Sequence, residues 1–203
     1  MTNRQLAALE TKKRLLEAGK CLICEKGLAN TAIEEITAAA GVSKGTFYTY
    51  FNRKEDILFE LSRSMFGEIL EAAKEVEGDF IAKMQDYMVN FSGYIEQGGV
   101  KMAQEWVKNV VNPDFVENEF DRGKLKYDLK SVHDLIQFSV SQGTLRDSVP
   151  AQKLSEILVD LLYGQMLCWS MSGGVYSLRA RTEDFCDFYL RELFQVYMNE
   201  EDM

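Results

Sequence analysis

A run of small and hydrogen-bonding residues lies near the N-terminal end of the chain, between two more apolar segments. It consists of Ser43, Lys44, Gly45, Thr46, Tyr48, Thr49 and Tyr50. Hydroxyl and ammonium groups can bond phosphate oxygens and the edges of nucleic-acid bases. Small side chains at a helix end also let that helix enter a major groove, and glycine leaves the most room. The run therefore predicts a nucleic-acid contact, with residues 43–46 facing base edges and residues 48–50 facing phosphates.

Three helices are expected to position this run. They are predicted over residues 11–26, 31–40 and 44–51, from the spacing of their apolar residues. Thr31 and Glu34 have the pattern of a capping box at the start of the second helix. Gly41, Val42 and Ser43 then make a short turn before the third helix. Two helices joined by a glycine-containing turn are typical of a helix-turn-helix, so the third helix is predicted to enter the groove.

Thr31 and Lys54 are two further candidates for contacts with an anion. Each is predicted at the start of a helix, where free amides and the helix dipole favour a negative group. A second capping pattern at residues 52–55 predicts a long helix that runs from residue 52 to about residue 74.

Formal charge is distributed unevenly along the chain. The whole chain carries 23 basic and 32 acidic side chains, a net charge of -9. Residues 1–56 carry nine basic and seven acidic side chains, a net charge of +2, and the remainder carries a net charge of -11. A basic segment attracts phosphate, and an acidic remainder discourages non-specific wrapping of DNA. The contact with DNA is therefore expected at the N-terminal end.

A long stretch of the chain follows one known pattern in order. It contains Leu16-Glu17-Ala18, Glu25-Lys26-Gly27-Leu28, Thr31, Ile33, Glu34, Ile36, Ala38, every residue from Ala40 to Phe51, and Lys54-Glu55-Asp56-Ile57-Leu58. Together these residues resemble the DNA-binding domain of the TetR family of regulators. The resemblance implies a two-domain, Ω-shaped homodimer of about nine helices per protomer that binds a palindromic operator in double-stranded DNA. It also implies that DNA is touched at Thr31, Lys44, Thr46, Tyr48, Tyr50 and Lys54.

The remainder of the chain is also predicted to be helical, since only Pro113 and Pro150 interrupt it. Helices are expected over about residues 80–98, 102–110, 125–142, 151–172 and 180–198, with a loop or a fragmentary helix at 112–120. The predicted fold class is all-α, with a helix-turn-helix domain over residues 1–56 and an antiparallel helical bundle over residues 75–203. The last two helices are apolar on more than one face, which predicts a homodimer through them.

Aromatic and methionine residues of the second domain are candidates for a pocket that binds a small apolar or aromatic effector. They are Tyr87, Met88, Phe91, Met102, Trp106 and Trp169. Such stripes also fit an ordinary core. Gln165 falls on the apolar side of its helix and needs a partner, either a ligand or the second protomer. His133, the only histidine, is expected in the core or at its rim, with a ligand contact as the alternative.

The sequence lacks the patterns that would indicate an enzyme or a metal site. A single histidine cannot supply paired Glu-x-x-His motifs, and neither a glycine-rich phosphate loop nor a nucleophile–base pair surrounds His133. Cys21 and Cys24 form a C-x-x-C pattern, but no second cysteine pair completes a zinc site. We interpret them as small apolar residues of a helix, with a thiol sensor as the alternative. No cofactor is expected.

The start of the chain lacks the apolar core of a secretory signal, and glycines and polar residues break the longest uncharged stretch. These features predict a cytoplasmic protein without a membrane partner. The functional hypothesis is a repressor that a small effector releases from a palindromic operator. The alternative is an activator or a corepressor-dependent regulator with the same DNA-binding domain.

Overall fold

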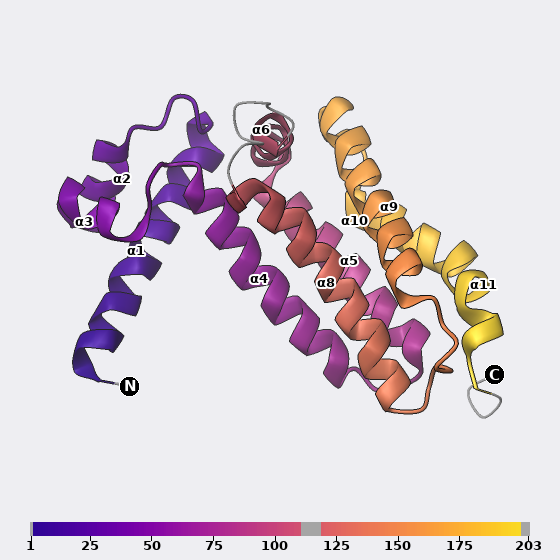
Figure 1. Ribbon diagram of the computed structural model, residues 1–203. Coiled ribbons are helices and arrows are strands. Elements are labelled where there is room, and N and C mark those ends of the chain that lie inside the picture. Colours follow the sequence, from indigo (N-terminus) through magenta and orange to yellow (C-terminus); the bar gives the residue numbers. More distant parts are fainter. Residues whose placement is uncertain (1, 111–118, 200–203) are drawn as a thin grey trace.

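The computed structural model describes residues 2–110 and 119–199, which form helices and short connections. Among these residues there is no β-strand, and one isolated antiparallel bridge joins Leu145 to Met198. The prediction of an all-α fold is confirmed. Three N-terminal helices gather at one end of the molecule, and the long helices of the C-terminal part fill the other end (Figure 1).

The N-terminal helices are α1 (Asn3–Lys26), α2 (Ile33–Ala40) and α3 (Lys44–Tyr50). Helix α1 begins well before the expected residue 11, because Thr2 and Gln5 form a capping box at its start. Residues 3–7 are exposed, so no apolar stripe marks this end of the helix in the sequence.

The turn between α2 and α3 is as predicted. Gly41 adopts a left-handed conformation with φ of 65°, and the Ser43 hydroxyl accepts a hydrogen bond of 3.1 Å from the Thr46 amide. The capping box predicted at Thr31 is wrong by one residue. Helix α2 is capped at Ala32, whose amide donates to the Glu35 carboxylate over 2.8 Å.

A compact core holds these helices together. Its fully buried members are Leu15, Ile23, Ile36, Phe47 and Ile57, and Leu28, Ala40, Phe51 and Leu58 complete it. Helix α3 contributes Phe47, and Phe51 directly follows it, with the two ring centroids 5.3 Å apart. The opposite side of α3 is thereby left to face solvent.

Helix α4 (Asp56–Glu75) joins this small core to a larger one. It does not begin at residue 52 as predicted, because the Asp56 carboxylate accepts hydrogen bonds from the Asn52 and Arg53 amides and holds residues 52–55 in a turn. Ile57 and Leu58 at its start lie in the small core, whereas the later Phe66, Ile69, Leu70 and Ala73 lie in the large core.

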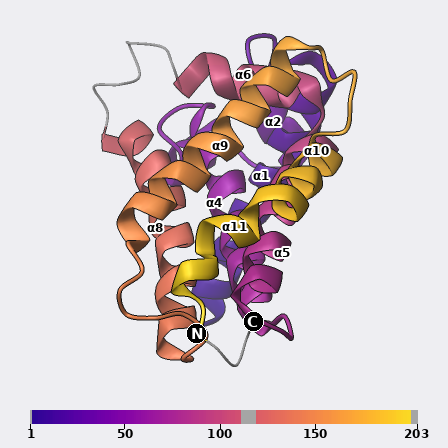
Figure 2. The ribbon, with the colours of Figure 1, turned by 90° about the vertical axis from the view of Figure 1, so that its right-hand side faces the viewer.

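The C-terminal part contains α5 (Phe80–Gly98), α6 (Val100–Val110), α8 (Glu119–Ser141) and α9 (Ala151–Met171). A last helical segment joins α10 (Leu178–Phe185), a π-helical turn (Cys186–Leu190), α11 (Arg191–Phe194) and a 3-10 turn (Gln195–Tyr197). Figure 2 shows that α9, α10 and α11 together form one side of the molecule. Most of the loop predicted at 112–120, with Pro113, lies outside the described residues.

Gly19 sets the distance between α1 and α4. A Cβ atom at this position would lie 2.7 Å from Ile57 Cδ1 and 2.9 Å from Ile57 Cγ2, closer than carbon atoms pack. We expect Gly19→Ala to lower the free energy of unfolding by about 1–2 kcal/mol, since overpacking costs about 1–3 kcal/mol and improved helix propensity offsets up to about 1 kcal/mol. Chemical denaturation measures this difference.

Gly164→Ala is the matched control, because a Cβ at this position in α9 would meet open space. It is expected to leave stability unchanged or to raise it. Equal stabilities of the two variants would show that α1 and α4 do not need the close approach at Gly19.

Candidate nucleic-acid interface and pocket

Helix α3 presents a polar surface to solvent. Its exposed members, which we call the α3 surface, are Ser43, Lys44, Gly45, Tyr48 and Thr49. Thr46 and Tyr50 are half-buried beside it. The Thr49 hydroxyl donates to the Gly45 carbonyl, and the Thr46 and Ser43 hydroxyls bond each other over 2.9 Å. The residues predicted to contact DNA from α3 are therefore brought together on one side of the helix or at its margin.

Lys44 on the α3 surface is paired with Glu34 of α2. The Lys44 Nζ and Glu34 Oε1 atoms lie 2.5 Å apart, and both side chains are more than half exposed. The hydrogen bond from Lys44 lowers the pKa of the Glu34 carboxyl, and the same bond raises the pKa of Lys44. An exposed pair of this kind contributes little to stability, so the Lys44 ammonium can exchange Glu34 for another anion.

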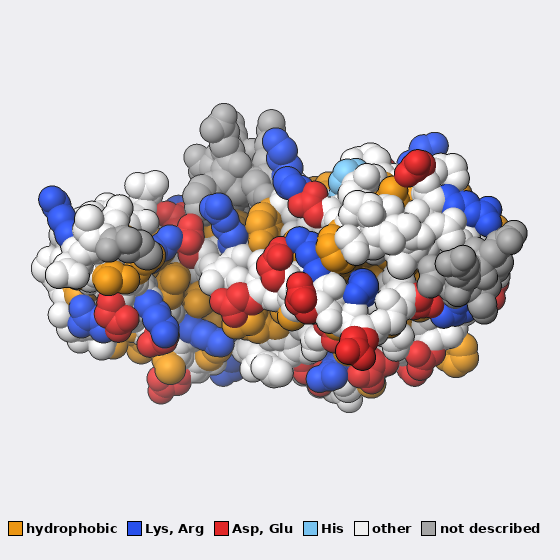
Figure 3. Space-filling view, turned by 90° about the horizontal axis from the view of Figure 1, so that it is seen from below, with side chains coloured by type: hydrophobic (Ala, Val, Ile, Leu, Met, Phe, Trp, Pro, Cys, Tyr) orange, Lys and Arg blue, Asp and Glu red, His pale blue; other side chains and the backbone are white. Residues whose placement is uncertain are grey.

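Charges of both signs mix over the N-terminal part of the molecule. In the view from below, lysine and arginine side chains alternate with acidic ones at the left (Figure 3). The small net positive charge of residues 1–56 is therefore not concentrated on the face that this view shows. A contact with phosphate here depends on individual side chains more than on a uniform basic field.

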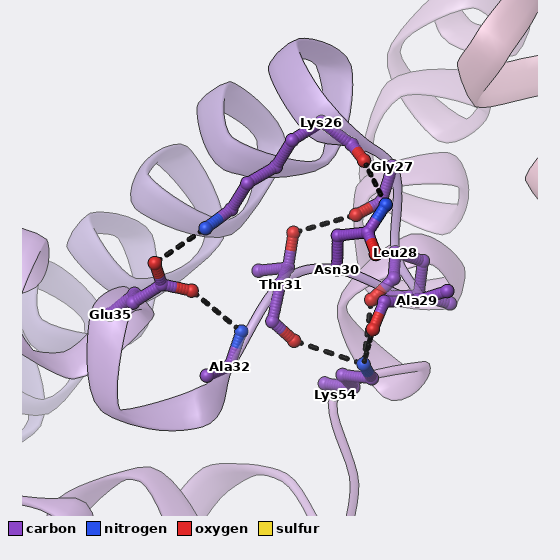
Figure 4. Close-up of polar contacts among 9 residues, drawn as sticks. All are labelled: Lys26, Gly27, Leu28, Ala29, Asn30, Thr31, Ala32, Glu35 and Lys54. Atoms are coloured by element: carbon purple, nitrogen blue, oxygen red, sulfur yellow. Dashed lines mark hydrogen bonds and ion pairs between the residues drawn. The ribbon is translucent and has the colours of Figure 1, made fainter.

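Lys54 binds the loop between α1 and α2. Its ammonium donates to the carbonyl oxygens of Leu28, Ala29 and Thr31 over 2.6, 3.3 and 2.9 Å (Figure 4). The Thr31 side chain is buried, and its hydroxyl donates to the Gly27 carbonyl over 2.8 Å. Both residues lie directly before the N-caps of α2 and α4, and these side-chain groups bind within the chain. A contact of either residue with an anion stays a prediction.

A largely apolar pocket, partly open to solvent, lies between the N-terminal helices and the C-terminal part; the space within it, including the part open to solvent, is about 580 Å³. Helices α1, α4, α5, α6, α8 and α9 all contribute to its wall. The lining residues are Lys20, Leu58, Leu61, Ser62, Phe66, Phe91, Tyr94, Ile95, Gly98, Met102, Ala103, Trp106, Lys124 and Met166. Among the residues predicted to bind a ligand, Phe91, Met102 and Trp106 line this pocket.

The other predicted ligand residues lie elsewhere. Tyr87 and Met88 are fully buried in the large core. Trp169 belongs to a separate small cluster, where its Nε1 donates to the Tyr176 carbonyl over 2.7 Å. His133 is half-buried, with its Nδ1 3.9 Å from the Asp134 carboxylate, which agrees with a position at the rim of the core.

Gln165 finds its partner within the chain. The Thr182 hydroxyl of α10 donates to Gln165 Oε1 over 2.8 Å, and the Ser92 and Thr182 hydroxyls bond each other over 2.7 Å. This amide oxygen therefore has a partner within the chain, and a contact of Gln165 with a ligand or a second protomer stays a prediction. The hydrogen bonds instead join α5, α9 and α10.

One wall of the pocket contains a buried ion pair. Lys124 and Asp128 are both almost fully buried, and the Lys124 ammonium donates to Asp128 Oδ2. The Tyr163 hydroxyl donates to the same oxygen over 2.5 Å. Burial lowers the pKa of Lys124 against the opposing effect of Asp128, and burial followed by the charge of Asp128 raises the pKa of Tyr163.

Aromatic rings surround the Lys124 ammonium. Its Nζ lies 4.3 Å from the centroid of Phe66 and 5.7 Å from those of Phe91 and Trp106. Lys20, Phe66 and Lys124 line the pocket although the sequence did not predict them there. No local pattern marks them, because helices far apart in the sequence bring them together.

The cysteines differ in exposure: Cys21 and Cys168 are exposed, Cys24 is half-buried and Cys186 is buried. All four are free, and within the described part of the chain no cluster of potential ligands could hold a metal ion. Burial raises the pKa of Cys24, and the Cys24 thiol donates to the Gly98 carbonyl. A raised pKa makes a thiol less reactive, which supports the interpretation of Cys24 as a packing residue.

Residues 15–61 match the model of a family described as bacterial regulatory proteins, tetR family, and these residues cover most of α1, all of α2 and α3, and the start of α4. This segment of the chain is therefore similar to the regulators of the TetR family.

Other proteins of similar sequence include the HTH-type transcriptional regulator AcrR of Shigella flexneri, which is 32% identical over 87 residues. That match covers 41% of this chain and 40% of AcrR. The fatty acid metabolism regulator protein of Bacillus subtilis is 36% identical over 62 residues, 30% of this chain and 32% of that protein. The chain thus spans less than half of the length of these curated relatives.

The TetR-family fold extends over most of the chain. The structure of Thermus thermophilus FadR, a TetR-family transcriptional repressor in complex with lauroyl-CoA, matches with a TM-score of 0.69 and 21% identity. The match covers 89% of this chain and 92% of that one. Within the segments that the structure describes, no helix combines the length and apolarity needed to cross a membrane.

Lys54→Met is expected to lower the free energy of unfolding by about 2 kcal/mol, because hydrogen bonds from a charged group contribute about 1.5–3 kcal/mol and three carbonyls lose their donor. Lys26→Met is the control. The Lys26 ammonium pairs with the half-exposed Glu35 at the surface, and its loss should cost less than about 1 kcal/mol. Thermal and chemical unfolding measure the stability of both variants. Equal losses in the free energy of unfolding would mean that Lys54 does not stabilise the loop between α1 and α2.

Proposed function

We propose that the chain is a transcriptional regulator that binds operator DNA through α3 and is released from it by a small molecule in the pocket. The observation that carries this proposal is the α3 surface, a polar helix side that the packing of Phe47 and Phe51 turns towards solvent. A helix-turn-helix places its second helix in the major groove with the first residues of that helix near base edges.

The proposed interface differs from the sequence-based one at two residues. Ser43, Lys44, Gly45 and Thr46 would contact base edges, and Tyr48, Thr49 and Tyr50 would donate hydroxyls to phosphates. Thr31 and Lys54 are left out, because one hydroxyl is buried and the other side chain already binds three carbonyls. Both support the helices that present the surface.

The pocket supports control by a small apolar or aromatic effector. FadR of Thermus thermophilus, which shares this fold, binds lauroyl-CoA in its solved structure. Here the pocket touches Leu58 and Leu61 at the start of α4 and Lys20 on α1, so an occupant would contact helices that carry the DNA-binding core. Occupancy that favours one position of these helices would change the affinity for DNA. No observation favours an activator or a corepressor-dependent regulator over this repressor.

A homodimer through the last helices completes the proposal. Large apolar side chains are exposed on α9, and others on the segment that follows α10. They are Ile157, Leu167 and Met171 on α9, and Phe188, Tyr189 and Val196 further on. Both segments belong to the side of the molecule that faces the viewer in Figure 2. A second copy would cover this apolar area and pair two α3 helices for a palindromic operator. Since operator DNA of bacteria lies in the cytoplasm, we place the protein there.

Lys44→Ala and Glu34→Gln are expected to change DNA affinity in opposite directions. A duplex selected from a random library by the purified protein serves as the probe, and fluorescence anisotropy measures the dissociation constant. Lys44→Ala should weaken binding about tenfold with partial loss of specificity, because a base-edge contact is worth about 1–3 kcal/mol. Glu34→Gln should strengthen binding several-fold, because it frees Lys44 and removes a repelling charge.

Lys13→Ala, at an exposed residue of α1 that pairs with Glu17, is the control and should bind as the wild type does. If no duplex is enriched in the selection, the proposed function is wrong. If Lys44→Ala binds the selected duplex like the wild type, α3 is not the contact.

Ile157→Glu combined with Phe188→Glu is expected to convert a dimer into a monomer. Burial in an apolar interface would remove the hydrating water of the two carboxylates without supplying a partner charge, which destabilises the dimer. Sedimentation velocity measures the mass of each species. Leu6→Glu, at an equally exposed apolar residue near the start of α1, should leave the dimer intact. If the variant with both substitutions is still a dimer, the interface lies elsewhere.

A further inference from the structure

Among the lining residues that the structure describes, both charged ones are basic. Lys20 and Lys124 contribute to the wall, and none of these described lining residues is an aspartate or a glutamate. The rest of them, except Ser62, are apolar, aromatic or glycine. A cavity of this composition favours a molecule with an apolar body and a negative group over a neutral or a positive molecule.

Lys124 already has its counter-charge. Asp128 lies directly behind it, and the ring of Phe66 covers its ammonium at 4.3 Å. Both partners of the pair are almost fully buried, so separating them would leave a buried charge alone. Lys124 therefore serves as part of the wall, and its charge is not available for a ligand.

Lys20 is different. Its side chain is half-buried, and its Nζ lies 5.4 Å above the ring of Tyr94, another lining residue. Among residues 2–108 and 124–199, the part of the chain whose side chains the structure describes, no carboxylate forms an ion pair with it. Its ammonium is thus a positive group at the pocket without an acidic partner among those residues.

The indole N–H of Trp106 is a second polar group at the pocket that lacks a partner among the described residues. This Nε1–H is buried, although the side chain lines the pocket. A buried donor without an acceptor costs about 1–3 kcal/mol, and such groups in a cavity commonly find their partner in a bound molecule or water. An acceptor oxygen on a ligand would satisfy it.

We infer that the pocket binds an amphipathic anion, with an apolar chain or ring among the aromatic residues and a carboxylate, phosphate or sulfate group on Lys20. This inference rests on the proposed function and specifies its effector class. Lys20 follows Gly19, which packs on Ile57, and it precedes Ile23 in the small core. An anion held by Lys20 therefore acts on the helix that supports the DNA-binding domain.

Three probes of equal chain length test the charge preference: decanoate, 1-decanol and decyltrimethylammonium, each kept below its critical micelle concentration. Calorimetry and tryptophan fluorescence report binding without DNA, because Trp106 lines the pocket and Trp169, the other tryptophan, does not. Decanoate is expected to bind at least about tenfold more tightly than decanol, and the cation least tightly. Equal binding of decanoate and decanol, or tighter binding of the cation, overturns the inference.

Lys20→Met tests the residue, since methionine keeps an unbranched side chain for the contact with Tyr94 but removes the charge. The affinity for decanoate should fall about tenfold while the affinity for decanol stays the same. Lys13→Met, on the same helix but outside the pocket, should bind all three probes as the wild type does. Melting temperatures confirm that both variants fold, and an unchanged affinity of Lys20→Met for decanoate overturns the assignment of Lys20.

The two proposals fail separately. If the protein binds its selected duplex but shows no preference for decanoate, the effector class is wrong and the regulator remains. If decanoate binds in a Lys20-dependent way but no duplex is enriched, the pocket assignment remains and the proposed function is wrong.

Discussion

Helix α4 is part of two hydrophobic cores, and this sharing constrains how the rest of the molecule can move. Ile57 at its start is fully buried against Gly19 of α1, while Phe66 and Ala73 further along are buried among α5 and its neighbours. Burial of one large apolar side chain contributes about 1.5–3 kcal/mol. Removing either end of α4 from its core would cost several kcal/mol, so a shift of the helix is expected to move the small N-terminal core with it.

The polar interactions follow from the same arrangement. Lys54 comes just before α4 and binds the carbonyls of the α1–α2 loop, so the start of α4 and the helix-turn-helix form one unit. The pocket lies where this unit meets the long helices, and its wall includes Leu58 and Lys20. A molecule in the pocket therefore touches both sides of the junction. The coupling that we propose between the pocket and the DNA-binding helices can pass through a single layer of side chains.

The sequence was sufficient for features that depend on local chemistry. Gly41 and Ser43 predicted the turn before α3, because a left-handed residue and a hydroxyl cap are requirements of a few neighbouring residues. The pocket was predicted only in part. Phe91 and Met88, one turn apart in α5, both belong to the large core, but only Phe91 also lines the pocket. The packing of α1 and α6 decides which side chain meets empty space, and no periodicity within α5 contains that information.

Dimethyl sulfate footprinting of the selected duplex tests most directly whether α3 occupies the major groove. The reagent methylates guanine N7 in the major groove and adenine N3 in the minor groove, so the two grooves are distinguished in one experiment. We predict that the protein protects guanine N7 in two symmetric half-sites and leaves adenine N3 reactive there, and that Lys44→Ala loses part of this protection. Protection of adenine N3 alone, with every guanine N7 still reactive, would contradict the account.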